Sequence, residues 1–129
     1  MRRPAATFLP ALLYAGVIFY LSSQSNPLPF LPRSVLSHDK VLHLIEYGGF
    51  AGLLSLGFSG LDLSWPRTFL FALLVASAYG ASDELHQYFV PNRECDVFDW
   101  MADTVGAGLG AAVGCAVLRR RRLRASIRS

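Results

Sequence analysis

Charged residues and cysteines are both scarce in this chain. Only 16% of its 129 residues are charged, 53% are apolar, and no run of like charge occurs before the C-terminus. A chain this short and this apolar is expected to form one domain over residues 1–129, which argues against a second domain. Its two cysteines, Cys95 and Cys115, are expected to lie roughly 30 Å apart along a helix, at 1.5 Å per residue, so they cannot pair within one subunit.

Wide polar stripes are missing from the apolar segments. The stretch from Phe69 to Ala78 reads FLFALLVASA, whereas each helix of a soluble bundle should carry a polar stripe, so the soluble alternative is disfavoured. Four apolar blocks are each about one bilayer long, because a helix needs roughly 20 residues to cross about 30 Å of hydrocarbon. We therefore predict an all-α, integral membrane four-helix bundle with approximate spans 5–22, 41–58, 67–87 and 97–118.

A cleavage site is missing after the first apolar block. Met1-Arg-Arg-Pro followed by an apolar run resembles a signal peptide, which is the alternative interpretation of this segment. The run is long for a signal core, however, and no A-x-A-like site follows it. We therefore expect a retained first helix.

Cations are unevenly distributed between the two sides of the predicted bundle. The N-terminus, the loop from Ser59 to Arg67 and the C-terminus would share one side. That side holds nine cations, namely Arg2, Arg3, Arg67, Arg119, Arg120, Arg121, Arg122, Arg124 and Arg128. The other side holds three, namely Arg33, Lys40 and Arg93. This positive-inside bias predicts that both termini are cytoplasmic.

The basic C-terminal segment has a second interpretation as a nucleic-acid-binding tail. Arg119 to Arg122 directly follows the last predicted span, and no aromatic residues are interleaved with the arginines. Anchoring beside anionic lipid fits this placement better. We therefore expect the lipid bilayer as a partner and no nucleic acid.

Three polar clusters then fall on the outer side of the membrane, at the ends of three different spans. They are Asp39, Lys40, His43, Glu46 and Tyr47; then Asp83, Glu84, His86 and Gln87; and finally Arg93, Asp96, Asp99 and Asp103. Within each helix the polar members recur every three or four residues, so they share one face. Only one of the nine acids, Asp62, is left on the inner side.

Several of these residues have a structural explanation as well as a functional one. Helix capping is the alternative for Asp39, Asp96 and Asp99. Ionisable groups inside a span cost about 2.5 to 3.5 kcal/mol each, so Glu46 and Asp103 need another explanation. One alternative is a satisfied structural network, in which Lys40 and Arg93 neutralise neighbouring carboxylates.

Glycines recur at intervals of four residues in two of the predicted spans. Gly106, Gly110 and Gly114 form one such series, and Gly48 and Gly52 form another. Small residues at this spacing let helices approach closely. We interpret them as packing positions, which also allow helix-mediated self-association.

The segments DKVLHLIEYGGF and DELHQYFVPNRECDVFDWMADTVG, together with SSQS after the first span, resemble the VanZ-like family. These are small bacterial membrane proteins named for a teicoplanin-resistance protein, and the resemblance covers nearly the whole chain. At the position of Asp103 the family often has asparagine. The resemblance implies a multi-pass protein of the bacterial cytoplasmic membrane, associated with the cell envelope and with glycopeptide susceptibility.

Three classes of function follow. The first is binding or handling of a lipid-linked or peptidoglycan-related anionic substrate, or the glycopeptide itself, at an outward-facing polar pocket. The second is a membrane enzyme that uses metal-assisted or acid/base chemistry on an envelope lipid. The third is an accessory subunit whose polar face receives another membrane protein. Binding or handling is the preferred interpretation, and it leaves open whether a reaction is catalysed.

The candidate site residues divide by expected role. Those suited to catalysis are Glu46, Asp83, Glu84 and His86. Those suited to substrate binding are Asp39, Lys40, His43, Tyr47, Gln87, Arg93, Asp99 and Asp103. The spacings His43-x-x-Glu46 and Asp83-x-x-His86 also occur in helical metal sites, but spacing alone assigns no metal ligand, and the cofactor is left unknown.

Overall fold

The computed structural model describes residues 4–32, 34 and 39–128, and its elements are all helical. The described helices are α1 (Pro4–Thr7), α2 (Leu9–Ser22), α4 (Asp39–Ser59), α5 (Trp65–Gln87) and α6 (Val97–Ile127). The predicted all-α class is therefore confirmed. Three of the cations used in the topology argument, Arg2, Arg3 and Arg33, lie outside the described residues.

Local sequence signals set several helix boundaries. Pro10 lies in the first turn of α2 and Pro66 in the first turn of α5, where the missing amide hydrogen of proline is not needed. Ser64 is the N-cap residue of α5, although its side chain makes no capping hydrogen bond. Asp96 caps α6, because its carboxylate accepts a hydrogen bond of 2.8 Å from the backbone N–H of Phe98.

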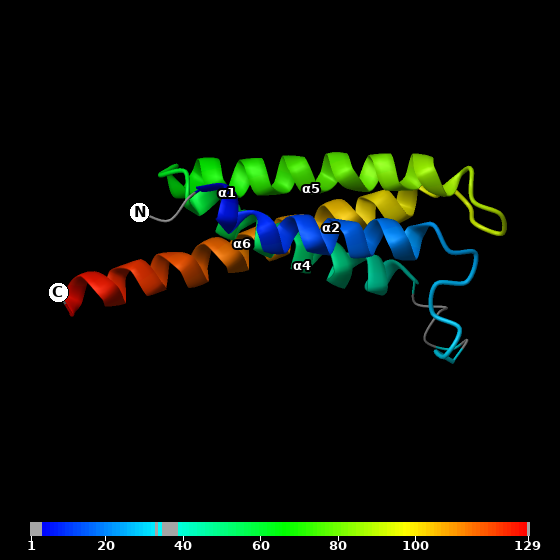
Figure 1. Ribbon diagram of the computed structural model, residues 1–129, viewed down its shortest axis with the longest axis horizontal. Coiled ribbons are helices and arrows are strands. Elements are labelled where there is room, and N and C mark those ends of the chain that lie inside the picture. Colours follow the sequence, from blue (N-terminus) through cyan, green and yellow to red (C-terminus); the bar gives the residue numbers. More distant parts are fainter. Residues whose placement is uncertain (1–3, 33, 35–38, 129) are drawn as a thin grey trace.

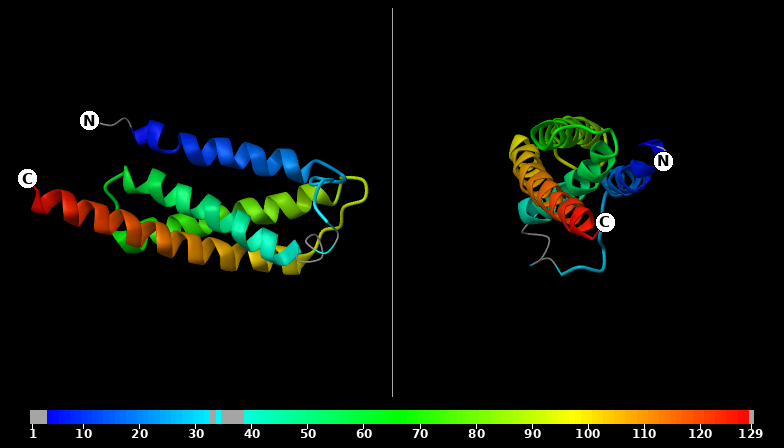
Figure 2. Two further views of the ribbon diagram at one scale, coloured as in Figure 1. Left: turned by 90° about the horizontal axis from the view of Figure 1, so that it is seen from below. Right: turned by 90° about the vertical axis from the view of Figure 1, so that its left-hand side faces the viewer.

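The long helices lie lengthwise beside one another (Figures 1 and 2). Helix α4 contacts α2, α5 and α6, and α5 also contacts α6. Both chain ends lie at one end of the molecule, and the segments that follow α2 and α5 lie at the opposite end (Figure 1). We call these the terminal end and the loop end.

The core combines alanines with four larger side chains, Ile18, Tyr47, Phe50 and Leu54, and the closest helix contact is between α4 and α6. Five alanines of α4, α5 and α6 are fully buried, namely Ala51, Ala72, Ala76, Ala107 and Ala111. A Cβ atom on Gly106 would collide with the carbonyl group of Leu44, and one on Gly110 would collide with that of Gly48. The predicted small-residue packing is therefore confirmed for this helix pair.

Large apolar side chains lie on the outside of the molecule. Leu12 of α2 is 66% exposed, Leu74 of α5 54% and Val113 of α6 64%. Large apolar side chains outside and small or polar ones inside are expected when the surrounding solvent is lipid. In the described part of the chain, α4 and α6 are long and apolar enough to cross a membrane, whereas α2 has 14 residues.

The α4–α6 contact yields a first prediction. Gly110→Ala should lower the free energy of unfolding by about 1 to 3 kcal/mol, because the added methyl group forces two backbones apart. Thermal unfolding of the detergent-solubilised protein, followed by circular dichroism, measures the loss. The matched control is Gly16→Ala in α2, where a Cβ atom would meet nothing within 4 Å. Equal stability of the two variants would show that the contact does not limit the fold.

Candidate functional site

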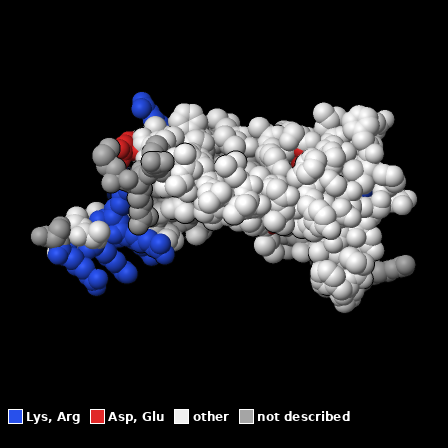
Figure 3. Space-filling model, in the orientation of Figure 1, with Lys and Arg blue, Asp and Glu red and all other residues white. Residues whose placement is uncertain are grey.

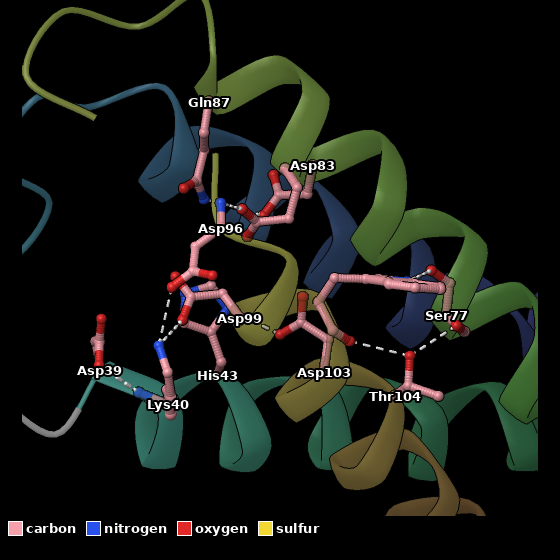
Figure 4. A network of polar contacts seen from close by, with 12 residues as sticks. Asp39, Lys40, His43, Ser77, Asp83, Gln87, Asp96, Asp99, Asp103 and Thr104 are labelled. Atoms are coloured by element: carbon pink, nitrogen blue, oxygen red, sulfur yellow. Dashed lines mark hydrogen bonds and ion pairs between the residues drawn. The ribbon is translucent and has the colours of Figure 1, made fainter. Parts of the chain in front are cut away.

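Polar side chains from α4, α5 and α6 meet at the loop end of the molecule (Figure 4). Lys40, in the first turn of α4, reaches across to the start of α6. Its Nζ atom lies 3.1 Å from Oδ2 of Asp96 and 2.8 Å from Oδ1 of Asp99. The predicted neutralisation of carboxylates by Lys40 is therefore observed, and it joins two helices that are distant in sequence.

His43 lies one turn further along α4 and faces two carboxylates of α6. Its Nδ1 atom is 2.8 Å from Oδ1 of Asp103, and its Nε2 atom is 3.7 Å from Oδ2 of Asp99 (Figure 4). Asp103 is 0% exposed, so this hydrogen bond is shielded from solvent. The contact with Asp103 fixes the orientation of the ring and leaves Nε2 directed toward Asp99.

Helix α5 contributes two further carboxylates from its last turns. Oε2 of Glu84 accepts a hydrogen bond of 2.9 Å from the backbone N–H of Asp96, and Gln87 donates to Asp83 at 3.4 Å. Oε1 of Glu84 is buried without a hydrogen-bond partner among the described residues. Oδ2 of Asp103 is also buried without a hydrogen-bond partner in the described part of the chain.

Asp96 belongs to the same network and is the N-cap residue of α6, directly before the helix begins. The Phe98 N–H and the Lys40 ammonium hold the pKa of the Asp96 carboxyl below its usual range. A lowered pKa means that the ionised carboxylate stabilises the folded chain above the ordinary aspartate pKa. This stabilisation is lost as the pH falls through the lowered value.

A cavity of about 470 Å³ opens beside the network, between α2, α4 and α5. Its apolar wall consists of Ile18, Leu21, Pro27, Leu28, Leu42 and Ile45. Its polar wall consists of Ser22, Asn26, Asp39, His43, Glu46, Asp83, Gln87 and Arg93. A ligand with both a polar head and an apolar portion fits such a lining.

Most of the predicted site residues converge here, but in two groups. Asp39, His43, Glu46, Asp83, Gln87 and Arg93 line the cavity. Lys40, Glu84, Asp99 and, through His43, Asp103 belong to the hydrogen-bonded network behind it. The structure thus brings together acids from three helices. The separation of these acids in sequence does not by itself show which of them contact one another.

Two predicted residues lie outside both groups. Tyr47 is buried among rings, with its centroid 6.2 Å from that of Phe50 and 6.5 Å from that of Tyr79. His86 faces α2, where Nε2 lies 3.0 Å from the Ser23 hydroxyl and the ring packs against Phe19. Both residues therefore contact neighbouring helices rather than the cavity.

Sequence reasoning missed the contribution of α2 and the segment that follows it. Ser22, Asn26 and Ile18 line the cavity, although none was selected as a site residue. The only available signal was the polar end of the first apolar block, Ser22-Ser23-Gln24-Ser25. The proximity of Ser22 to Asp83 depends on how α2 packs, which the sequence does not reveal.

One group of side chains has the composition of a metal site. Within the described residues, ligand atoms of His43, Glu84 and Asp99 all lie within 4.8 Å of one another. The three residues come from α4, α5 and α6. The pairs noted from helical spacing, His43 with Glu46 and Asp83 with His86, do not form this group.

The apolar exterior and the two helices long and apolar enough to cross a membrane suggest a helical membrane protein, with a polar pocket at one end of the molecule. Comparison with protein families matches residues 6–119 to VanZ/LLP1. The chain therefore belongs to the VanZ-like family, as its sequence motifs predict. No curated protein and no solved structure matches the chain.

The buried contact between His43 and Asp103 yields a second prediction. A double-mutant cycle of His43→Ala and Asp103→Ala should give a coupling free energy of about 1 to 2 kcal/mol. Either single substitution already removes the shielded hydrogen bond, so the second substitution cannot remove it again. Chemical unfolding in detergent supplies the four free energies. His43→Ala combined with Thr68→Val is the control, since Thr68 lies in the first turn of α5 at the terminal end, and these two effects should add. A coupling near zero for His43 and Asp103 would contradict the geometry.

Proposed function

We propose that this chain crosses the bacterial cytoplasmic membrane four times, with the terminal end in the cytoplasm and the cavity facing outward. Arginines gather where α6 ends, as Figure 3 shows, and α5 begins at the same end with Arg67. Arg122 also donates to the carbonyl group of Ser59 and lies 5.0 Å above the Trp65 ring. Clustered arginines are typical of the cytoplasmic side of a membrane, and tryptophan is typical of a membrane interface on either side.

We further propose that the cavity binds the anionic head of a lipid-linked envelope precursor. The observation that supports this most is the union of an apolar wall with Arg93 in one cavity. Arg93 is half-buried and has no ion-pair partner within 4 Å among the described residues. A guanidinium that lines a cavity without a direct ion pair suits a phosphate or carboxylate group.

The acids of the cavity restrict how such a head can bind. Asp39, Glu46 and Asp83 also line the cavity, so an anion enters a region with more carboxylates than basic side chains. Coulomb repulsion at short range is large in a partly buried site. The proposed ligand therefore contacts Arg93 on one side and is separated from the carboxylates by a proton or a bound cation on the other.

A link to glycopeptide susceptibility follows from this ligand. A protein that holds an envelope precursor at the outer face competes with antibiotics that bind the same molecule. We propose that the chain lowers susceptibility to teicoplanin-type glycopeptides in this way. The apolar wall would hold the first part of the lipid chain, which is why the ligand is a lipid-linked precursor rather than a soluble one.

The proposed orientation is tested with cysteine labelling. Cys95 is exposed in the segment between α5 and α6, whereas Cys115 is buried. In intact cells, a Cys115→Ser variant should react at Cys95 with a membrane-impermeant maleimide. A variant with Ser126→Cys as its only cysteine should react only after lysis, because Ser126 lies at the terminal end. The reverse pattern would invert the topology and remove the proposed function.

Ligand binding is tested with a polyprenyl phosphate added to the detergent-solubilised protein. The wild type should gain thermal stability as the ligand concentration rises, because a ligand that binds only the folded state shifts unfolding. Arg93→Gln should weaken binding at least about tenfold, since every 1.4 kcal/mol of lost interaction is a factor of ten. The same variant should lose protection against teicoplanin when expressed in a susceptible strain.

Arg67→Gln is the matched control, because it removes an exposed arginine from the opposite end of the molecule. It should leave polyprenyl phosphate binding unchanged. Equal binding by the wild type and Arg93→Gln would refute the assignment of Arg93. Stabilisation by a lipid with an amine head, and none by the phosphate, would show that the acids of the cavity bind a cationic ligand instead.

A further inference from the structure

We propose that His43, Glu84 and Asp99 bind a divalent metal ion at the loop end of the helices. Each ligand comes from a different long helix, namely α4, α5 and α6. The metal site goes beyond the proposed lipid binding and does not depend on it. Only the role of the ion in holding a phosphate rests on the proposed function.

The ligand atoms are near enough to one another to meet at one ion after an inward movement of the side chains. One atom from each of the three residues lies within 4.8 Å of the others. Two ligand atoms that are each about 2.1 Å from a metal lie about 3.4 Å apart at a tetrahedral angle. His43 Nε2 and Asp99 Oδ2 are 3.7 Å apart, so this pair needs little movement.

Each of the three side chains is held in place by a contact with a neighbouring residue. In each case we take the other nitrogen or oxygen of the side chain as the atom offered to the metal. The second nitrogen of His43 contacts Asp103 at 2.8 Å, and the second oxygen of Asp99 contacts Lys40 at 2.8 Å. Oε2 of Glu84 accepts the Asp96 N–H at 2.9 Å. Such partners orient metal ligands, and the carboxylate of Asp103 behind His43 also raises the basicity of the imidazole.

The unpartnered oxygen of Glu84 is the independent observation. Glu84 is only 4% exposed, and its Oε1 atom has no hydrogen-bond partner in the described part of the chain. Buried polar atoms in proteins are nearly always satisfied, and an orphaned one is commonly explained by an unseen ion or water. A cation beside His43 and Asp99 gives this oxygen a partner.

The ligand set indicates the class of metal. One imidazole and two carboxylates leave one or more coordination positions open, and Zn²⁺ and Mn²⁺ both accept nitrogen and oxygen ligands of this kind. His43 also lines the cavity, so the open positions are reached from it. If the proposed lipid binds there, the ion supplies the positive charge that its phosphate requires among the carboxylates.

The test uses Zn²⁺ alone, without any lipid. Protein purified in detergent without chelator should contain roughly one metal ion per chain by elemental analysis, and the stripped protein should bind Zn²⁺ in a calorimetric titration. Glu84→Gln should weaken binding at least about tenfold while keeping an oxygen that accepts the Asp96 N–H. Asp103→Asn should weaken it about 10- to 100-fold, as expected for a positioning residue behind His43.

Asp39→Asn is the matched control, because Asp39 lines the same cavity on the same helix as His43 but lies outside the ligand group. It should leave Zn²⁺ affinity unchanged. Equal loss in Asp39→Asn and Glu84→Gln would mean diffuse attraction to acids and would overturn the site. If the ligand variants fail to fold, the wild type decides, since well under one equivalent of bound metal refutes the proposal. Binding of polyprenyl phosphate to the metal-free protein is measured separately. A protein that binds this lipid but no Zn²⁺ would refute the metal site and leave the proposed function intact.

Discussion

The contact between α4 and α6 is the constraint on which the rest of the structure depends. Gly106 and Gly110 bring the backbone of α6 against the carbonyl groups of Leu44 and Gly48. At this separation the polar side chains near the loop end of both helices meet directly. Lys40 reaches Asp99, and His43 reaches a fully buried Asp103. A larger residue at either glycine would separate these partners as well as the helices.

Pairing across helices also explains how so many acids occupy one end of an apolar molecule. An isolated ionisable group in hydrocarbon is costly, whereas one that faces a partner on a neighbouring helix is not. Four acids at the loop end have such partners: Asp96 and Asp99 contact Lys40, Asp103 contacts His43, and Glu84 accepts the backbone N–H of Asp96. Oε1 of Glu84 and Oδ2 of Asp103 are buried without a hydrogen-bond partner among the described residues, so the network is incomplete at these two atoms.

The cavity is the second consequence of helix packing, and it separates two roles for the polar residues. Helix α2 completes it with Ile18, Leu21 and Ser22, opposite the acids of α4 and α5. Glu46 and Arg93 face the cavity, while the network formed by Lys40, His43 and Asp99 stands behind it. His43 belongs to both. A change at His43 would therefore affect ligand binding and helix association together.

The sequence by itself determined the helical class, the family and the set of polar residues at the loop end, because these follow from apolar block length, glycine spacing and local motifs. It also determined the Asp96 cap, which depends on residues close in sequence. Only the tertiary structure decided which acids meet which cations. It directed His86 toward Ser23 and Tyr47 toward Tyr79, and it added Ser22 to the cavity. Helical spacing fixes the face of one helix, but contacts between helices depend on the rotation and separation that packing sets.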